Sequence, residues 1–111
     1  MNTFRKGDTM NDTKDLYLVL VYPQEVNFDE GKRIQKAIFE ATGEEPRKIG
    51  DMGRASFFLA FAEFSDLRKR IEEELALTTQ LLIVQACAPW TTRGFSPTAA
   101  NLKKHIGHYR I

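Results

Sequence analysis

Two hydrophobic patterns follow one another along this chain, one typical of strands and one typical of helices. The run LYLVLVY, residues 16–22, consists of β-forming residues and is ended by Pro23, so it predicts a strand with apolar side chains on both faces. In the next segment Asn27 and Glu30 have the spacing of a helix cap, and Gly43 has the place of a C-terminal glycine. Between these ends, apolar residues recur at helical spacing, at Ile34, Ala37, Ile38 and Ala41. This segment predicts the first helix.

The central part of the chain predicts a hairpin followed by a second helix. A short strand at 47–49, a turn at 50–53 and a long strand at 55–64 make the hairpin. Ser65 is the expected N-cap of a helix that runs to about residue 77. The inward positions of that helix are Leu67, Ile71 and Leu75.

The last third of the chain predicts a fourth strand and a short third helix. Pro89 ends the strand, at 80–88, while Ser96, Pro97 and Gly107 are typical of the start and end of a helix. The whole order is β-α-β-β-α-β with an added terminal helix. It predicts an α+β fold, a two-layer ferredoxin-like sandwich with an extra short C-terminal helix.

The length of 111 residues fits one domain. We expect a polar, disordered lead-in at 1–14, in which Met10 is an alternative start to Met1, and a single folded domain at 15–111. The lead-in lacks the apolar segment of a signal peptide or a membrane span. The one cysteine excludes an internal disulfide. Together these features predict a cytoplasmic protein.

Strand periodicity separates the predicted sheet into two faces, and both are apolar. The first face is expected to pack against the two main helices and collects Leu16, Leu18, Leu20, Tyr22, Phe57, Leu59, Phe61, Leu82, Val84 and Ala86. The second face collects Tyr17, Val19, Val21, Ser56, Phe58, Ala60, Ala62, Phe64, Ile83, Gln85 and Cys87. In a bare two-layer fold the second face would contact water, and so large an apolar surface is unusual on a monomer. We therefore expect something to cover it.

Three covers remain open for the second face: the predicted C-terminal helix, a second copy of the chain in a homodimer, or a ligand or protein partner held beneath a cover. The small side chains of Val19, Ala60 and Ala62 would allow another backbone layer to approach closely. Ligand or partner contacts are predicted on this face and in the loop after the fourth strand. The predicted contact residues are Tyr17, Val19, Phe58, Ala60, Cys87, Trp90, Arg93 and Phe95.

Charge gives little direction to binding, because 16 basic and 15 acidic residues leave a net charge of +1. Anion or nucleic-acid contacts are expected only where cations gather. Three basic residues follow the expected start of the second helix, where backbone N–H groups are unpaired, and two lie in the predicted third helix. The candidate cations are Arg54, Arg68, Lys69, Arg70, Lys103 and Lys104.

Nucleic-acid binding is the first alternative function. The segment RASFFLAF, residues 54–61, partly resembles the third strand of RNA-recognition-motif domains in Arg54 and Phe58, and Tyr17 supplies an aromatic side chain on the first strand. It departs from that pattern at Ala55, which stands in place of a glycine. The resemblance implies single-stranded RNA or DNA stacked on the second face, whereas packing against a cover explains the same aromatic residues.

A small enzyme is the second alternative, because Cys87 with His105 or His108 would pair a nucleophile with a base. A thiol midway along an apolar strand is more typical of a small buried hydrophobe. No residues have the spacing of a metal site, and no cofactor motif is present. We therefore predict a non-enzymatic binding or interaction module, without metal or cofactor, that is covered by a second copy or by its last helix.

Overall fold

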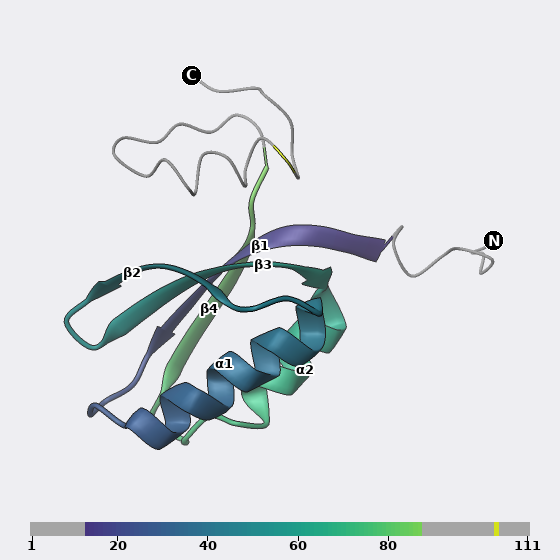
Figure 1. Ribbon diagram of the computed structural model, residues 1–111. Coiled ribbons are helices and arrows are strands. Elements are labelled where there is room, and N and C mark those ends of the chain that lie inside the picture. Colours follow the sequence, from purple (N-terminus) through teal and green to yellow (C-terminus); the bar gives the residue numbers. More distant parts are fainter. Residues whose placement is uncertain (1–12, 88–103, 105–111) are drawn as a thin grey trace.

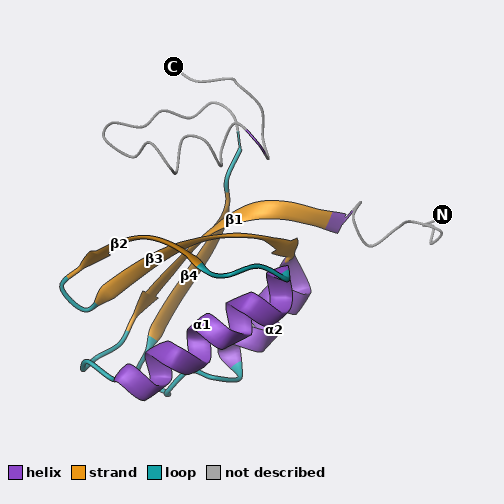
Figure 2. Ribbon diagram, viewed as in Figure 1, coloured by secondary structure: helices purple, strands orange, loops and turns teal. Residues whose placement is uncertain are grey.

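The computed structural model describes residues 13–87 and 104 of the chain. Within them the elements are β1 (Lys14–Tyr22), α1 (Phe28–Thr42), β2 (Arg47–Met52), β3 (Ala55–Glu63), α2 (Phe64–Glu72) and β4 (Gln80–Gln85). The strands form one antiparallel sheet in the order β2-β3-β1-β4, and both helices lie on one face of it (Figure 1 and Figure 2). The predicted α+β class is confirmed, and the order of the described elements is consistent with the predicted β-α-β-β-α-β arrangement. The predicted third helix lies outside the described residues except for Lys104.

The first helix begins and ends where the sequence predicts. The Asn27 side chain accepts the backbone N–H of Glu30 at 3.0 Å, which satisfies one free donor of the first turn. At the other end Gly43 has a φ of 76° and donates its N–H to the carbonyl oxygen of Phe39 at 2.7 Å. A side chain is strained at such a φ, so glycine suits this position.

The second helix is shorter than predicted and has a different cap. Its N-cap is Glu63, whose carboxylate accepts the N–H groups of Ser65 and Asp66 at 3.1 and 2.8 Å. The predicted cap at Ser65 is therefore wrong: the cap lies two residues earlier, at Glu63, whose negative side chain also favours the positive end of the helix dipole. The helix ends at Glu72, before the expected end near 77.

The core lies between the helices and the sheet face that contains Tyr17, Val19 and Phe58, so the predicted assignment of the two faces is wrong. The second face is the one that the helices cover. Its small residues, such as Ala60 and Ala62, leave room for α1 and α2, and strict alternation then places the bulkier set on the opposite face. The buried core is Tyr17, Val19, Val21, Ile34, Ala37, Ile38, Ala41, Phe58, Ala60, Ala62, Leu67 and Ile71.

The β2–β3 hairpin differs from its predicted form in two ways. Its turn consists of Gly53, with a φ of 60°, and Arg54, so most of the expected turn at 50–53 belongs to β2. The register also shifts between Lys48 and Gly50, which indicates a β-bulge. Residues three apart in a regular strand lie on opposite faces, but here Lys48 and Asp51 both align with helix-facing residues of β3.

Candidate functional site

The sheet face away from the helices is apolar across all four strands, and we call it the open face. Its rows follow from the strand register: Phe57, Leu20 and Leu82 align in one row, and Leu59, Leu18 and Val84 in the next. No helix of the described residues packs over this face (Figure 2). The members of the open face are Leu16, Leu18, Leu20, Ile49, Phe57, Leu59, Phe61, Leu82, Val84 and Ala86.

Exposure is uneven across the open face. Leu16 and Leu59 are buried and form a small second cluster with their partly buried neighbours. On β4, in contrast, Leu82 is 51% and Val84 is 41% exposed. The side of the sheet next to β4 therefore has the most exposed apolar side chains of the open face, and a contiguous apolar patch of this kind is typical of an interaction surface.

Polar pairs lie at the edge of the open face. The Tyr22 hydroxyl accepts a hydrogen bond from Arg54 Nη2 at 2.9 Å, and the Arg54 guanidinium carbon lies 5.0 Å from the Tyr22 ring centroid. On β2 the guanidinium of Arg47, which aligns with Leu59 across the strands, pairs with Glu44 at 2.8 Å. An apolar centre with a polar rim is the usual anatomy of a protein interface.

Four of the predicted contact residues are not on the open face. Tyr17, Val19, Phe58 and Ala60 lie in the core beneath the helices, because the faces are reversed. Stacking of bases on Tyr17 and Phe58 at an uncovered sheet face is therefore wrong. Cys87 follows β4 and is exposed, rather than a buried hydrophobe. The remaining predictions, at Trp90, Arg93, Phe95 and Lys103 and at the histidine partners of Cys87, lie outside the described residues.

The cations of the second helix do not form the expected anion site. Because α2 is short, Lys69 and Arg70 lie in its last turn, where the dipole favours positive charge, and not at its start. Arg70 Nε donates to both oxygens of Asp66 at 3.0 and 3.1 Å. Arg68 pairs with Glu72 at 3.0 Å. These contacts match ordinary surface pairs between neighbouring helix turns.

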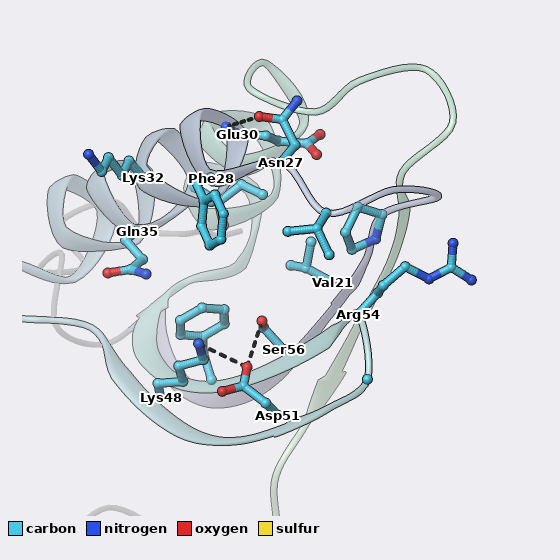
Figure 3. A pocket seen from close by; sticks show the side chains of 16 residues that line it. Val21, Asn27, Phe28, Glu30, Lys32, Gln35, Lys48, Asp51, Arg54 and Ser56 are labelled. Carbon is cyan, nitrogen blue, oxygen red and sulfur yellow. Dashed lines mark hydrogen bonds and ion pairs between the residues drawn. The ribbon is translucent and has the colours of Figure 1, made fainter.

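A cleft of about 530 Å³ lies on the helix side of the sheet, between the first half of α1 and the β2–β3 hairpin. Figure 3 shows Phe28 and Gln35 extending from α1, with Lys48, Asp51 and Ser56 facing them from the hairpin. The volume falls within the range of small-molecule sites, about 300–1,000 Å³. Two of the predicted contact residues, Phe58 and Arg54, line this cleft, although they were assigned to another surface.

The hairpin side of the cleft carries a small polar network. Lys48 Nζ lies 2.8 Å from Asp51 Oδ1, and the Ser56 hydroxyl donates to the same oxygen at 3.0 Å (Figure 3). The hydrogen bond from Lys48 lowers the pKa of Asp51 below its ordinary value, and the bond from Ser56 adds to this effect. Asp51 is thus an anion whose charge is already paired within the protein.

Glu30 lies at the end of the cleft but serves the fold. Its side chain is buried, with 2% of the residue exposed. Its Oε2 accepts the backbone N–H of Ala76 at 2.6 Å and the hydroxyl of Thr79 at 2.8 Å. The carboxylate therefore ties the start of α1 to the loop between α2 and β4. A ligand in the cleft would not meet this charge unpaired.

The cleft contains four residues that were not predicted from the sequence: Phe28, Gln35, Lys48 and Asp51. One signal was available, because Phe28 follows the helix cap but is off the inward stripe of α1, and an aromatic residue there is left exposed. The pairing of Lys48 with Asp51 had no such signal, since it depends on the bulge.

No group of three or more His, Cys, Asp or Glu side chains in 13–87 and 104 is arranged to hold a metal ion. None of the helices in this part of the chain is long and apolar enough to cross a membrane.

Comparisons with protein-family models, with curated proteins and with solved structures found no match to this chain.

Proposed function

We propose that this protein is a small non-enzymatic interaction module, of ferredoxin-like arrangement, that self-associates through its open face. The observation that supports this function is the apolar surface opposite the helices, with Leu82 51% exposed and Val84 41% exposed. A second copy is the occupant, and it covers the same face of its partner.

Self-association suits this surface because the open face is complementary to itself. Two antiparallel sheets stack face to face at about 10 Å with their strands about 30° apart. A two-fold dimer then brings the row of Leu18 and Val84 of one copy against the same residues of the other. The centre of the open face is apolar, and the strand register places Lys14, Glu63 and Gln80 at its ends. This arrangement matches the depletion of charge at the centre of homodimer interfaces. A nucleic acid would need cations there.

The size of the face sets the strength of the dimer. Strands lie about 4.8 Å apart and rise about 3.3 Å per residue, so four strands of about seven residues cover about 440 Å² on each copy. Both copies together bury about 900 Å² when each face is treated as flat, without the extra area that protruding side chains add. A specific interface usually exceeds about 1,000 Å². We therefore expect a dimer that dissociates on dilution, with a Kd in the micromolar range.

The test is sedimentation velocity across protein concentrations from about 1 µM to about 1 mM, a range that brackets the expected Kd. The wild-type protein is expected to change from monomer to dimer. Leu82→Glu is expected to remain monomeric, because burial of one leucine contributes about 1.5–3 kcal/mol and a two-fold interface contains it twice, a loss of at least about 100-fold in affinity. Phe39→Glu, at a 43% exposed position on α1, is the matched control and is expected to dimerise like the wild type.

Circular dichroism of each variant shows that the fold is retained. A wild-type protein that stays monomeric over the whole range would overturn the proposal. Equal dimerisation of Leu82→Glu and wild type would place the dimer contact elsewhere and would overturn it as well.

A further inference from the structure

The cleft between α1 and the hairpin has walls that suit an aromatic ligand. Phe28 is 80% exposed and Val26 is 62% exposed, and both line the cleft from the segment where α1 begins. The buried residues Val21, Ile34 and Phe58 also line it. A flat apolar group placed between these surfaces would remove Phe28 from water without any change to the core.

One cation is directed to the centre of the cleft. The bulge in β2 keeps Lys48 on the helix side, where it aligns with Phe58 across the strands. The Lys48 ammonium group has three N–H donors, and it forms an ion pair with Asp51. The other donors remain for a ligand acceptor. Figure 3 shows the Lys48 nitrogen between the hairpin and α1, with the Gln35 amide opposite.

The charges around the cleft favour an anion. Lys32 and Lys48 line it, and so does Arg54, whose guanidinium is bound to the Tyr22 hydroxyl. Against the two carboxylates of the lining, these three cations leave a net charge of +1. Of the two carboxylates that line it, Glu30 is bound to the loop after α2, and Asp51 is paired with Lys48 and Ser56. The protein groups left to interact with a ligand are therefore positive or neutral.

We propose that this cleft binds a small planar aromatic ligand that carries a carboxylate or a similar anionic group. The aromatic part lies between Phe28 and the Phe58 side of the cleft, and the anion accepts hydrogen bonds from Lys48. The cleft is on the helix side of the sheet and the proposed dimer contact is on the other side. Ligand binding and self-association are therefore separate properties, and each can fail without the other.

The probe is 2-naphthoate, titrated into the isotopically labelled full chain and followed by backbone amide NMR. Saturable shifts are expected at residues of the cleft, such as Gly31, Lys48 and Ser56, and not at Leu82 or Val84. For a probe of this size we expect a Kd of about 1 mM or lower. The neutral analogue 2-naphthamide is expected to bind at least about tenfold more weakly, since it lacks the charge that Lys48 pairs.

Two variants have matched controls on the same protein. Phe28→Ala is compared with Phe39→Ala, which removes an exposed phenylalanine of α1 outside the cleft. Lys48→Met is compared with Lys36→Met, which removes a cation of α1 that lines another groove. Phe28→Ala and Lys48→Met are each expected to weaken 2-naphthoate binding by about tenfold, with the controls unchanged.

Three results would overturn the proposal. The first is the lack of saturable shifts, and the second is a set of shifts confined to the open face. The third is equal binding by Phe28→Ala and Phe39→Ala. If 2-naphthamide binds as well as 2-naphthoate, the anionic part of the ligand is refuted. None of these results depends on whether the protein dimerises.

Discussion

Among the polar groups of the described fold, the carboxylate of Glu30 is expected to cause the largest loss of stability when it is removed by mutation. It is 2% exposed and accepts hydrogen bonds from Ala76 N and Thr79 Oγ1 at 2.6 and 2.8 Å, across 46 and 49 residues of chain. Hydrogen bonds to a charged group contribute about 1.5–3 kcal/mol each, so the pair contributes about 3–6 kcal/mol. In a variant without the carboxylate, water can hydrogen-bond to the Ala76 N–H, because Ala76 is exposed, and this recovers part of the lost free energy. We expect Glu30→Ala to lower the free energy of unfolding by about 2–4 kcal/mol.

That loss is large for a domain whose whole stability is about 5–15 kcal/mol. It corresponds to a fall in Tm of about 10 °C or more. Glu30→Gln keeps an oxygen acceptor without the charge and is expected to lose about half as much. Glu40→Ala is the control. Glu40 is on the same helix, but its ion pair with Arg70, at 3.6 Å, is exposed to solvent, so this variant is expected to lose less than about 1 kcal/mol of unfolding free energy.

Urea unfolding followed by circular dichroism, at one protein concentration, measures these differences. Hydrogen exchange adds a local measurement, since the Ala76 amide is expected to be protected in the wild type and to exchange rapidly in Glu30→Ala. The reasoning fails if Glu30→Ala and Glu40→Ala unfold at the same urea concentration, or if the Ala76 amide is unprotected in the wild type.

Two further predictions concern titration. Lys48→Met is expected to raise the pKa of Asp51 toward its ordinary value, about 4, because the hydrogen bond that lowers it is lost. Carboxyl NMR titration measures this, and an unchanged pKa would contradict the pairing. Burial raises the pKa of Tyr17, and the negative charges of Asp15 and Glu63 add to the shift. The stability it contributes is thus fully present below about pH 10 and is lost as the pH rises through the folded-state pKa. Tyr17→Phe should lessen the alkaline fall in stability, and identical curves would count against this account.

The order of elements follows from local signals in the sequence. Asn27 and Gly43 are recognisable as the ends of α1, and the inward residues Leu67 and Ile71 of α2 are buried as predicted. Each of these depends on the residue and its near neighbours, through backbone capping and helical spacing. Local chemistry therefore predicts the elements well, although Glu63 replaces Ser65 as the cap of α2.

The choice of sheet face had no local signal. Both faces of β1 are apolar, so alternation separates Leu18 from Val19 without showing which one meets the helices. The small size of Ala60 and Ala62 did indicate a closely packed layer, but that layer is the pair of helices and not an added cover. The face that meets the helices depends on how distant elements pack together.

The cleft was partly visible in the sequence. Phe58 and Arg54 were candidates on grounds of residue type, and both line the cleft. Lys48 and Asp51 become neighbours only through a register shift that involves pairing with a second strand. A bulge of this kind is a property of the strand pair, so one strand's sequence does not show it.

The positions of β1 and β4 have a practical consequence. They are antiparallel neighbours, with Tyr17 aligned to Gln85, so the chain enters β1 and leaves β4 at the same end of the sheet (Figure 1). The cleft is at the other end, near Val21 and Arg54. Entry and exit points on adjacent strands are about 5 Å apart. The two flanking segments therefore join the sheet side by side, and anything attached to either of them lies at the end of the sheet away from the cleft.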